Sequence, residues 1–285
     1  MSDSRGDKNA VFGGAPAVQQ GMPTQNVMKD DFGFEIPVEL VPLPSGGKTY
    51  PVDCSFHGQP AVQIRAMTAR EEDILTSRAL IKEGTVISSL IKSCLIDKTF
   101  NVRDLLSGDR NALMVALRVT GYGSDYSVDV DCPMCNERSK QEFNLTELSI
   151  KRLEIDPVNP GENLFEFKLP MTKAVVRFRF LTGKDEETIT VSNARRKKAG
   201  FKTDNIVTQK FQYSIMQVGE HTDKVKIQRF IENMPARDSL ELRRYMDQHE
   251  PGIDMRQWMN CPSCHEESEV AIPLGVTFFW PDTGN

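Results

Sequence analysis

Four of the six cysteines form two closely spaced pairs, and this spacing is typical of metal ligands. The pairs lie at 132–135 and 261–264, and both read Cys-Pro-x-Cys. A Cys-x-x-Cys turn presents two thiolates on one small knuckle, and tetrahedral zinc takes four thiolates at about 2.3 Å. Proline at the second position stiffens each turn. We therefore predict one structural Zn²⁺, held by Cys132, Cys135, Cys261 and Cys264.

Other chemistry at these cysteines fits the pattern less well. A redox pair sits where a strand meets a helix, whose N-terminus lowers the thiol pKa, and neither pair here precedes a helical pattern. Catalytic zinc keeps an open position and usually has His or carboxylate ligands, whereas four cysteines close the shell. His265 directly follows Cys264 and is the alternative ligand. No catalytic residues are predicted, because the four histidines show no ligand spacing and no nucleophile partner.

Composition sets the class of protein. The chain has 285 residues, of which 39% are hydrophobic and 26% charged, an ordinary globular balance. Its formal net charge of -5 provides no basic field to attract phosphate backbones, so nucleic acid is a disfavoured partner. No signal-peptide core and no apolar run long enough for a membrane span is present. We expect a soluble chain that stays in the compartment where it is made.

The elements that must position the cysteines occur in an internal sequence repeat. An alternating strand pattern ends at Thr68, with Glu71 three residues later, and a second ends at Thr182, with Asp185 three residues later. This is the spacing of a capping box, in which hydroxyl and acid satisfy free backbone donors of a helix. The acids also lie in the first helical turn, where the helix dipole favours negative charge.

In each copy of the repeat, the predicted elements after the capping box follow in the same order. In the first copy, a helical pattern at 109–120 is followed by a strand pattern at 126–130 that leads into the first cysteine pair. In the second copy, the helical pattern lies at 235–248 and the strand pattern, at 255–259, leads into the second pair. Strand-like segments also follow both pairs, so each pair is predicted to form the tip of a hairpin. We predict an α+β fold of two related α/β halves, a tandem internal duplication joined through a four-cysteine zinc-ribbon-like site.

The predicted boundaries divide the chain into four parts. They are a disordered N-terminal arm at 1–33, a first half at 34–148, a second half at 149–275, and an aromatic C-terminal segment at 276–285. The aromatic segment is either a final strand packed on the core or a docking segment for another subunit. The candidate docking residues are Phe278, Phe279 and Trp280.

Two signals that look chemical have plainer interpretations. Gly46-Gly47-Lys48-Thr49 suggests a phosphate-binding loop, but Pro42 stands where that motif needs glycine, so we predict a turn. The basic run 195–198 closes a helix whose first turn is acidic, which matches the helix dipole at both ends.

Several strings resemble a known family. Three segments are similar to the baseplate hub assembly proteins of contractile-tailed, T-even type bacteriophages. They are Leu-Pro-Ser-Gly-Gly-Lys-Thr-Tyr-Pro at 43–51, Met-Thr-Ala-Arg-Glu-Glu-Asp-Ile-Leu at 67–75, and the stretch from 108–113 through 120–123 to the first cysteine pair. The resemblance is strongest over about residues 40 to 145. The second cysteine pair and the aromatic end are consistent with it.

The resemblance implies a late, non-enzymatic protein of virion morphogenesis that works on the central hub of the tail baseplate. It implies protein partners, namely other baseplate and tail proteins, with no small-molecule substrate and no membrane, and it leaves open whether copies of the chain itself are partners. It also implies the cytoplasm of the infected host cell during assembly, and it leaves two alternatives open: the chain stays in the tail baseplate of the virion, or it acts as an assembly factor. Beyond the cysteines, it transfers no functional residue.

Two alternative functions remain open from the residues alone. A zinc-ribbon, nucleic-acid-associated regulatory protein needs a basic surface near the knuckles, whereas their flanks carry Asp129, Asp131, Glu137, Glu266 and Glu267. A metallohydrolase needs an open zinc position and a nearby general base.

Overall fold

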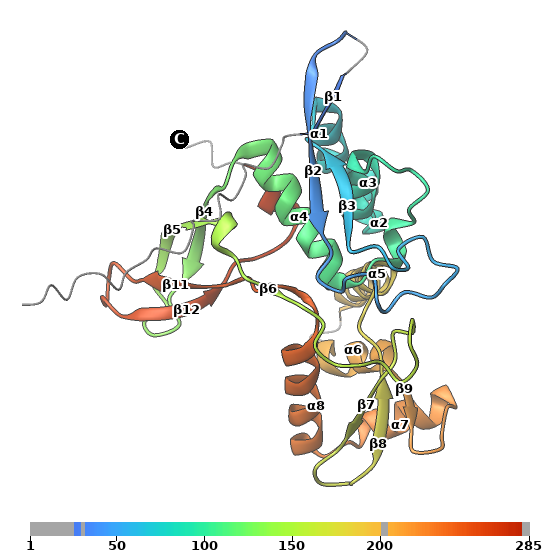
Figure 1. Ribbon diagram of the computed structural model, residues 1–285. Helices are drawn as coiled ribbons and strands as arrows, with labels where there is room; N and C mark the ends of the chain where they lie inside the picture. Colours follow the sequence, from blue (N-terminus) through green and yellow to red (C-terminus); the bar gives the residue numbers. More distant parts are fainter. Residues whose placement is uncertain (1–25, 30–31, 201–204, 281–285) are drawn as a thin grey trace, which may run out of the picture.

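The computed structural model describes residues 26–29, 32–200 and 205–280, and in this part of the chain it has the predicted mixed α+β character, with eight α-helices and several small antiparallel sheets (Figure 1). None of the described helices combines the length and apolar character that a membrane span needs. Most of the predicted N-terminal arm lies outside the described residues. Within it, Asn26–Lys29 form strand β1.

The first half combines a three-stranded sheet with four helices. Its strands, in the spatial order β1-β2-β3, are β1 (Asn26–Lys29), β2 (Glu35–Pro42) and β3 (Ala61–Arg65). Its helices are α1 (Ala69–Thr76), α2 (Arg78–Glu83), α3 (Val86–Cys94) and α4 (Ser107–Tyr122). Val62 and Ile64 alternate with exposed Gln63 on β3, so one face of the sheet joins the core.

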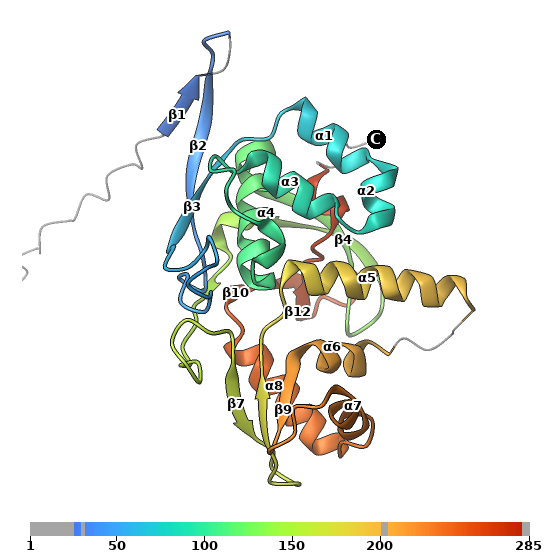
Figure 2. The same ribbon diagram turned by 90° about the vertical axis from the view of Figure 1, so that its right-hand side faces the viewer.

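The second half has the same kind of parts. Its strands, in the spatial order β7-β8-β9, are β7 (Phe165–Lys168), β8 (Val175–Phe178) and β9 (Ile215–Val218). Its helices are α5 (Gly183–Lys198), α6 (Ile206–Ser214), α7 (Lys224–Glu232) and α8 (Ala236–His249). Figure 2 shows α5 lying between the two groups of elements. Buried Phe165, Phe178 and Phe180 pack against one another in the hydrophobic core.

Two hairpins lie side by side at the edge of the molecule (Figure 1). They consist of β4 (Asp125–Asp131) with β5 (Arg138–Asn144), and β11 (Arg256–Asn260) with β12 (Glu267–Ala271). Each hairpin carries one cysteine pair at its tip, as predicted. A short pairing of β6 (Ile150–Lys151) with β10 (Gly252–Ile253) connects the segment after the first hairpin to the segment before the second hairpin.

Both predicted capping boxes form, at Thr68 and at Thr182. Glu71 is fully buried and accepts hydrogen bonds from the Thr68 backbone and hydroxyl at 2.9 and 2.7 Å and from the Arg65 guanidinium at 2.7 and 3.0 Å. Burial alone would raise the pKa of Glu71, but the hydrogen bonds from Arg65, Ser93 and Thr68 lower it to about 2.

The second box repeats this arrangement with an aspartate. Asp185 accepts from the Thr182 backbone and hydroxyl at 2.9 and 2.7 Å and from both terminal nitrogens of Arg179 at 2.8 Å. Burial opposes ionisation of Asp185, but the bonds from Arg179 and Thr182 hold its pKa below the usual value. Both boxes therefore contain an arginine three residues before the threonine, which the sequence prediction overlooked.

The first turn of α4 is the place where the two halves meet. Ser107 donates its backbone N–H to Leu181 at 2.9 Å, and Gly183 donates to Leu105 at 2.9 Å, so the segment before α5 pairs with the segment before α4. A Cβ atom on Gly108 would lie 1.6 Å from the carbonyl oxygen of Pro251. Only glycine fits this approach of two backbones.

The predicted turn at 43–51 is anchored on the same helix. Buried Asp109 accepts hydrogen bonds from the Ser45 backbone and hydroxyl at 2.9 and 2.5 Å and from the Tyr50 hydroxyl at 2.5 Å. Tyr50 in turn accepts from the backbone of Leu106 at 2.9 Å. Residues 44–49 form turns, as predicted, and the next helix, α1, begins only at Ala69.

The aromatic C-terminal segment packs on the core, but as a 3₁₀ turn, Val276–Phe279, rather than a strand. Phe278 and Phe279 are fully buried, and the Phe278 ring lies 4.9 Å from that of Tyr126. Two of the three predicted docking side chains therefore belong to the hydrophobic core, because the chain end folds back onto α4. Trp280, 37% exposed, is the one with surface left for a partner.

Gly108→Ala should lower the free energy of unfolding by about 2–3 kcal/mol, because the added methyl group forces α4 away from Pro251. Gly275→Ala is the matched control, since its Cβ meets nothing within 4 Å and its backbone is extended. Thermal unfolding of both variants tests this expectation. Equal melting temperatures would mean that the two backbones do not touch.

Glu71→Gln should cost about 3 kcal/mol at pH 7, because it leaves the Arg65 guanidinium without its buried partner. The folded carboxyl titrates at about 2 and the unfolded one near 4.5, so the stability Glu71 provides is present above pH 4.5 and is lost as the pH falls toward 2. The difference between wild type and variant in urea unfolding should shrink over this range. The exposed Asp73→Asn on the same helix should change stability by less than about 0.5 kcal/mol at any pH.

Candidate metal centre

The two cysteine knuckles have the same local structure. In the first, the Cys132 N–H donates to the Glu137 carbonyl at 2.9 Å, and the Asn136 N–H donates to the Cys132 carbonyl at 2.8 Å. The second repeats both bonds, from Cys261 to Glu266 at 3.1 Å and from His265 to Cys261 at 2.9 Å. Each knuckle thus reads Cys-Pro-x-Cys-x-Glu and closes a tight loop between two strands.

The residue after each pair adopts a left-handed backbone. Asn136 has φ 58° and His265 has φ 59°. Non-glycine residues are uncommon in this region, although Asn and His are among the types that tolerate it best. This conformation turns the chain back into β5 and β12, so it places both thiols of a knuckle on the same side. It also gives His265 a backbone role, and the thiol cluster is complete without its side chain.

The knuckles bring four sulfur atoms together. All four Sγ atoms lie within 4.8 Å of one another. Cys132 and Cys264 are 3.8 Å apart, and Cys135 and Cys261 are 3.7 Å apart. Four thiolates at about 2.3 Å from a tetrahedral zinc would be roughly 3.8 Å from each other. The donor set and the two closest distances therefore fit a tetrahedral thiolate site, so the four cysteines form a cluster that could bind a metal ion.

A small apolar core supports the cluster from below. Val130, Cys132, Met259 and Cys261 are buried together, with Val128, Cys264 and Val270 packed against them. The side chain of Gln141 also donates to the Asn260 carbonyl at 3.3 Å, which links the two hairpins directly. The hairpins thus contact each other through few apolar side chains, and the thiols occupy the centre of that contact.

The thiols differ in acidity without a metal. The pKa of Cys261 is lowered to about 7, mainly by the backbone N–H groups of Cys264 and Ser263. For Cys135, the backbone N–H of Glu137 favours the thiolate, but burial and hydrogen bonds shared with the other thiols raise its pKa to about 12. The Cys261 thiol therefore ionises near neutral pH, whereas the Cys135 thiol ionises only at much higher pH. Because a metal ion binds thiolates, its binding would release protons from the cluster.

The structure also shows what the sequence interpretation missed. Besides the two arginines of the capping boxes, a cavity lined by parts of α4, α5, α6 and α8 contains Glu250, whose pKa is raised to about 7. The signal for the arginines was available, since Arg65 and Arg179 stand at the same offset from their threonines. Nothing in the local sequence marks Glu250, because its surroundings come from distant segments.

Comparison with known families identifies the class of protein. The family described as T4 bacteriophage base plate protein matches residues 36–280, which is most of the chain. The chain belongs to this family. Comparisons with curated proteins and with solved structures found no match. The matched range begins in β2 and ends at Trp280, so it includes all eight described α-helices, both hairpins and all four clustered cysteines, and of the first three-stranded sheet it omits β1.

Cys261→Ser should remove one equivalent of bound metal from the purified chain and lower the melting temperature by about 10 °C, because metal binding energy is folding energy at such sites. Metal content by elemental mass spectrometry, together with thermal unfolding, tests this. Cys54→Ser is the matched control, since Cys54 is a partly buried thiol outside the cluster. Unchanged metal content and melting in Cys261→Ser would contradict the assignment.

Proposed function

We propose that this chain is a non-enzymatic structural or assembly protein of the phage tail baseplate hub, and that it acts through contacts with other baseplate and tail proteins. The observation that carries the proposal is the family match over residues 36–280. Assembly of the hub places the chain in the host cytoplasm, with the virion as a further location if it remains in the particle. Contacts with copies of itself belong to the same proposal.

The metal in this proposal is one structural Zn²⁺ held by Cys132, Cys135, Cys261 and Cys264. Four thiolates are the ligand set of closed structural zinc sites, and they leave no open position for a substrate or an activated water. The pairs are far apart in the chain, since Cys135 and Cys261 are separated by 126 positions. The ion would therefore act as a staple between the two halves, in a place where the apolar contact is small.

The alternative functions have less support. The exposed residues that flank the knuckles include Asp129, Asp131, Glu137, Glu266 and Glu267, and this acidic surface would repel a phosphate backbone. A metallohydrolase would need a non-cysteine ligand or a free coordination position, and neither accompanies the described cluster. Neither function has an observation of its own that favours it.

We also infer that the two halves arose by duplication, within the proposed boundaries of 34–148 and 149–275. In each half an antiparallel strand pair, β2–β3 or β7–β8, leads into an Arg-x-x-Thr-x-x-acid capping box, and a hairpin with Cys-Pro-x-Cys-x-Glu at its tip follows. These three features occur in the same order. The halves differ in the placement of their helices: α1 to α4 all lie between the first sheet and its hairpin, whereas α5 and α6 precede the third strand of the second sheet, β9, and only α7 and α8 lie between that sheet and its hairpin.

A phage that lacks this gene should fail to build baseplates and should accumulate tail precursors, and a plasmid copy should restore plaque formation. Electron microscopy of lysates and quantitative mass spectrometry of purified particles provide the measurement. A fixed, low copy number per particle would define a structural subunit, whereas presence only in the infected-cell extract would define an assembly factor. Normal baseplates without the gene would contradict the proposal.

A further inference from the structure

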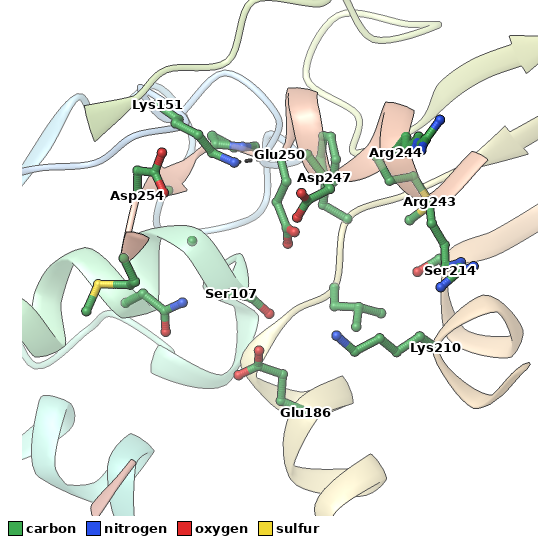
Figure 3. Close-up of a pocket in the computed structure, with 18 of the residues that line it drawn as sticks. Ser107, Lys151, Glu186, Lys210, Ser214, Arg243, Arg244, Asp247, Glu250 and Asp254 are labelled. Atoms are coloured by element: carbon green, nitrogen blue, oxygen red, sulfur yellow. Dashed lines mark hydrogen bonds between the residues drawn. The ribbon is translucent and has the colours of Figure 1, made fainter. Parts of the chain in front are cut away.

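The cavity around Glu250 does not define an occupant by its charge (Figure 3). Basic side chains such as Lys151 and Lys210 are mixed in its wall with acidic ones such as Glu186 and Asp247. A cation and an anion would therefore both meet like charges there. A different hollow, between α2 and α5, has one dominant charge.

This second hollow is a groove of about 640 Å³ between α2 and the last two turns of α5. Figure 2 shows the two helices beside each other, and a Cβ atom on Gly84, the residue after α2, would lie 3.3 Å from Val191 on α5. The lining residues come from successive turns on one face of each helix. Ala79, Val191 and Ala194 form an apolar strip along the groove.

Three basic side chains line the same groove. They are Lys82 from α2 and Arg195 and Lys198 from α5, and the groove has one acid, Glu83. All three cations are exposed and form no ion pair within the described part of the chain. The dipole of α5 favours basic residues at its C-terminal end, but it does not account for Lys82, which converges on them from another helix. We call this surface the basic groove.

The two cysteine knuckles present a surface of the opposite charge. Met134 at the tip of the first hairpin is 67% exposed, and Asp131 and Glu137 stand three positions before and after it. The second knuckle adds Glu266 and Glu267. These four acids are exposed, and none of them forms an ion pair with another described residue. We call this surface, with Met134 at its centre, the acidic tip.

The basic groove and the acidic tip are complementary in two respects. Each combines an apolar centre with charged side chains around it, and the charges have opposite sign. Methionine is unbranched and flexible, so Met134 can adapt to the apolar strip. Within one chain the two surfaces lie on different sides of the molecule, with the hairpins at the left of Figure 1 and α2 and α5 at the right. A contact between them therefore joins two copies.

Two objections from charge do not exclude this contact. The formal net charge of -5 repels two copies at long range, but physiological salt screens such repulsion beyond about 8 Å, whereas the facing charges act at shorter range. A nucleic acid would also be attracted by the cations, but it fits the groove less well. Glu83 and the apolar strip offer no contact to phosphates.

We propose that the acidic tip of one copy docks in the basic groove of a second copy, with Met134 against the apolar strip and the carboxylates of Asp131 and Glu137 facing the three cations. The inference rests on the proposed function, which includes contacts between copies of the chain, and it names the two surfaces of one such contact. Each copy contributes a different surface, so repeated contacts close into a ring or continue as a filament.

Sedimentation of the full chain at increasing concentration is the first test. Association with a Kd on the order of 10–100 µM is expected at about 50 mM salt, and it should weaken at least tenfold at about 500 mM. The groove variant Lys82→Gln/Arg195→Gln/Lys198→Gln should also weaken it at least tenfold. The matched control is Lys224→Gln/Lys226→Gln/Arg229→Gln, which removes three exposed cations from α7, outside the groove, and should leave association within twofold.

Mixing two variants tests which surfaces meet. The tip variant Met134→Ser/Glu137→Gln should not self-associate, but an equal mixture with the groove variant should form a dimer and nothing larger, because one intact tip and one intact groove remain. Metal content and melting temperature show whether the tip variant is folded. Glu266→Gln/Glu267→Gln, in the other knuckle, is the second tip variant and should weaken association several-fold. A mixture that stays monomeric would overturn the pairing of tip and groove.

Other outcomes would also overturn the proposal. They are a wild-type chain that stays monomeric at about 200 µM in low salt, and a groove variant that associates as the wild type does. A single-stranded DNA of about 20 nucleotides is the probe for the competing ligand. Binding that the groove variant loses, in a wild-type chain that does not self-associate, would assign the groove to nucleic acid instead.

Complementation in the phage separates this inference from the baseplate function. The groove variant should complement the gene deletion at least tenfold less well than the α7 control variant. Full complementation by a groove variant that no longer associates would overturn the role of the contact in assembly, while the baseplate function stands. Normal baseplates in the deletion itself would overturn the baseplate function, whatever the association measurements give.

Discussion

The close backbone contact at the first turn of α4 is the constraint on which the arrangement of the two halves depends. Four consecutive residues each make a different connection there. Ser107 pairs with Leu181, Gly108 touches Pro251, Asp109 anchors the turn at 43–51, and Arg110 donates to Gly183 at 3.4 Å and to Glu186 at 3.1 Å. One helical turn thus fixes three distant segments.

This contact also explains the position of α5. Its first turn is held by Arg110 and by its own capping box, and buried Glu187 accepts hydrogen bonds from Ser88 at 2.5 Å and Arg103 at 2.9 Å. Buried carboxylates are tolerated only when they are well paired, so each of these acids specifies its neighbours. At the two hairpins the separate apolar cluster is small, and the thiols occupy the centre of the contact between them.

Local spacing was sufficient to predict the capping boxes, the hairpin tips and the membership of the cysteine cluster. The helical patterns at 109–120 and 235–248 were close to α4 and α8, which begin at Ser107 and Ala236. The burial of Phe278 and Phe279 was not predictable in the same way, because it depends on where the chain end lies relative to α4. The cavity around Glu250 has the same origin, since its walls come from residues more than 100 positions apart.

The distance along the chain between the two cysteine pairs has a consequence for synthesis. A ribosome that adds about 5–20 residues per second needs roughly 6–25 s to make the 126 residues from Cys135 to Cys261. During that interval the first hairpin presents half of a ligand set, with two thiols exposed to oxidants or to the same half-site of another nascent chain. The four-sulfur centre closes only after the last hairpin leaves the exit tunnel. The four-cysteine cluster therefore forms late in synthesis. A chain truncated before Cys261 cannot form it, so an assembled cluster marks a chain that contains both hairpins.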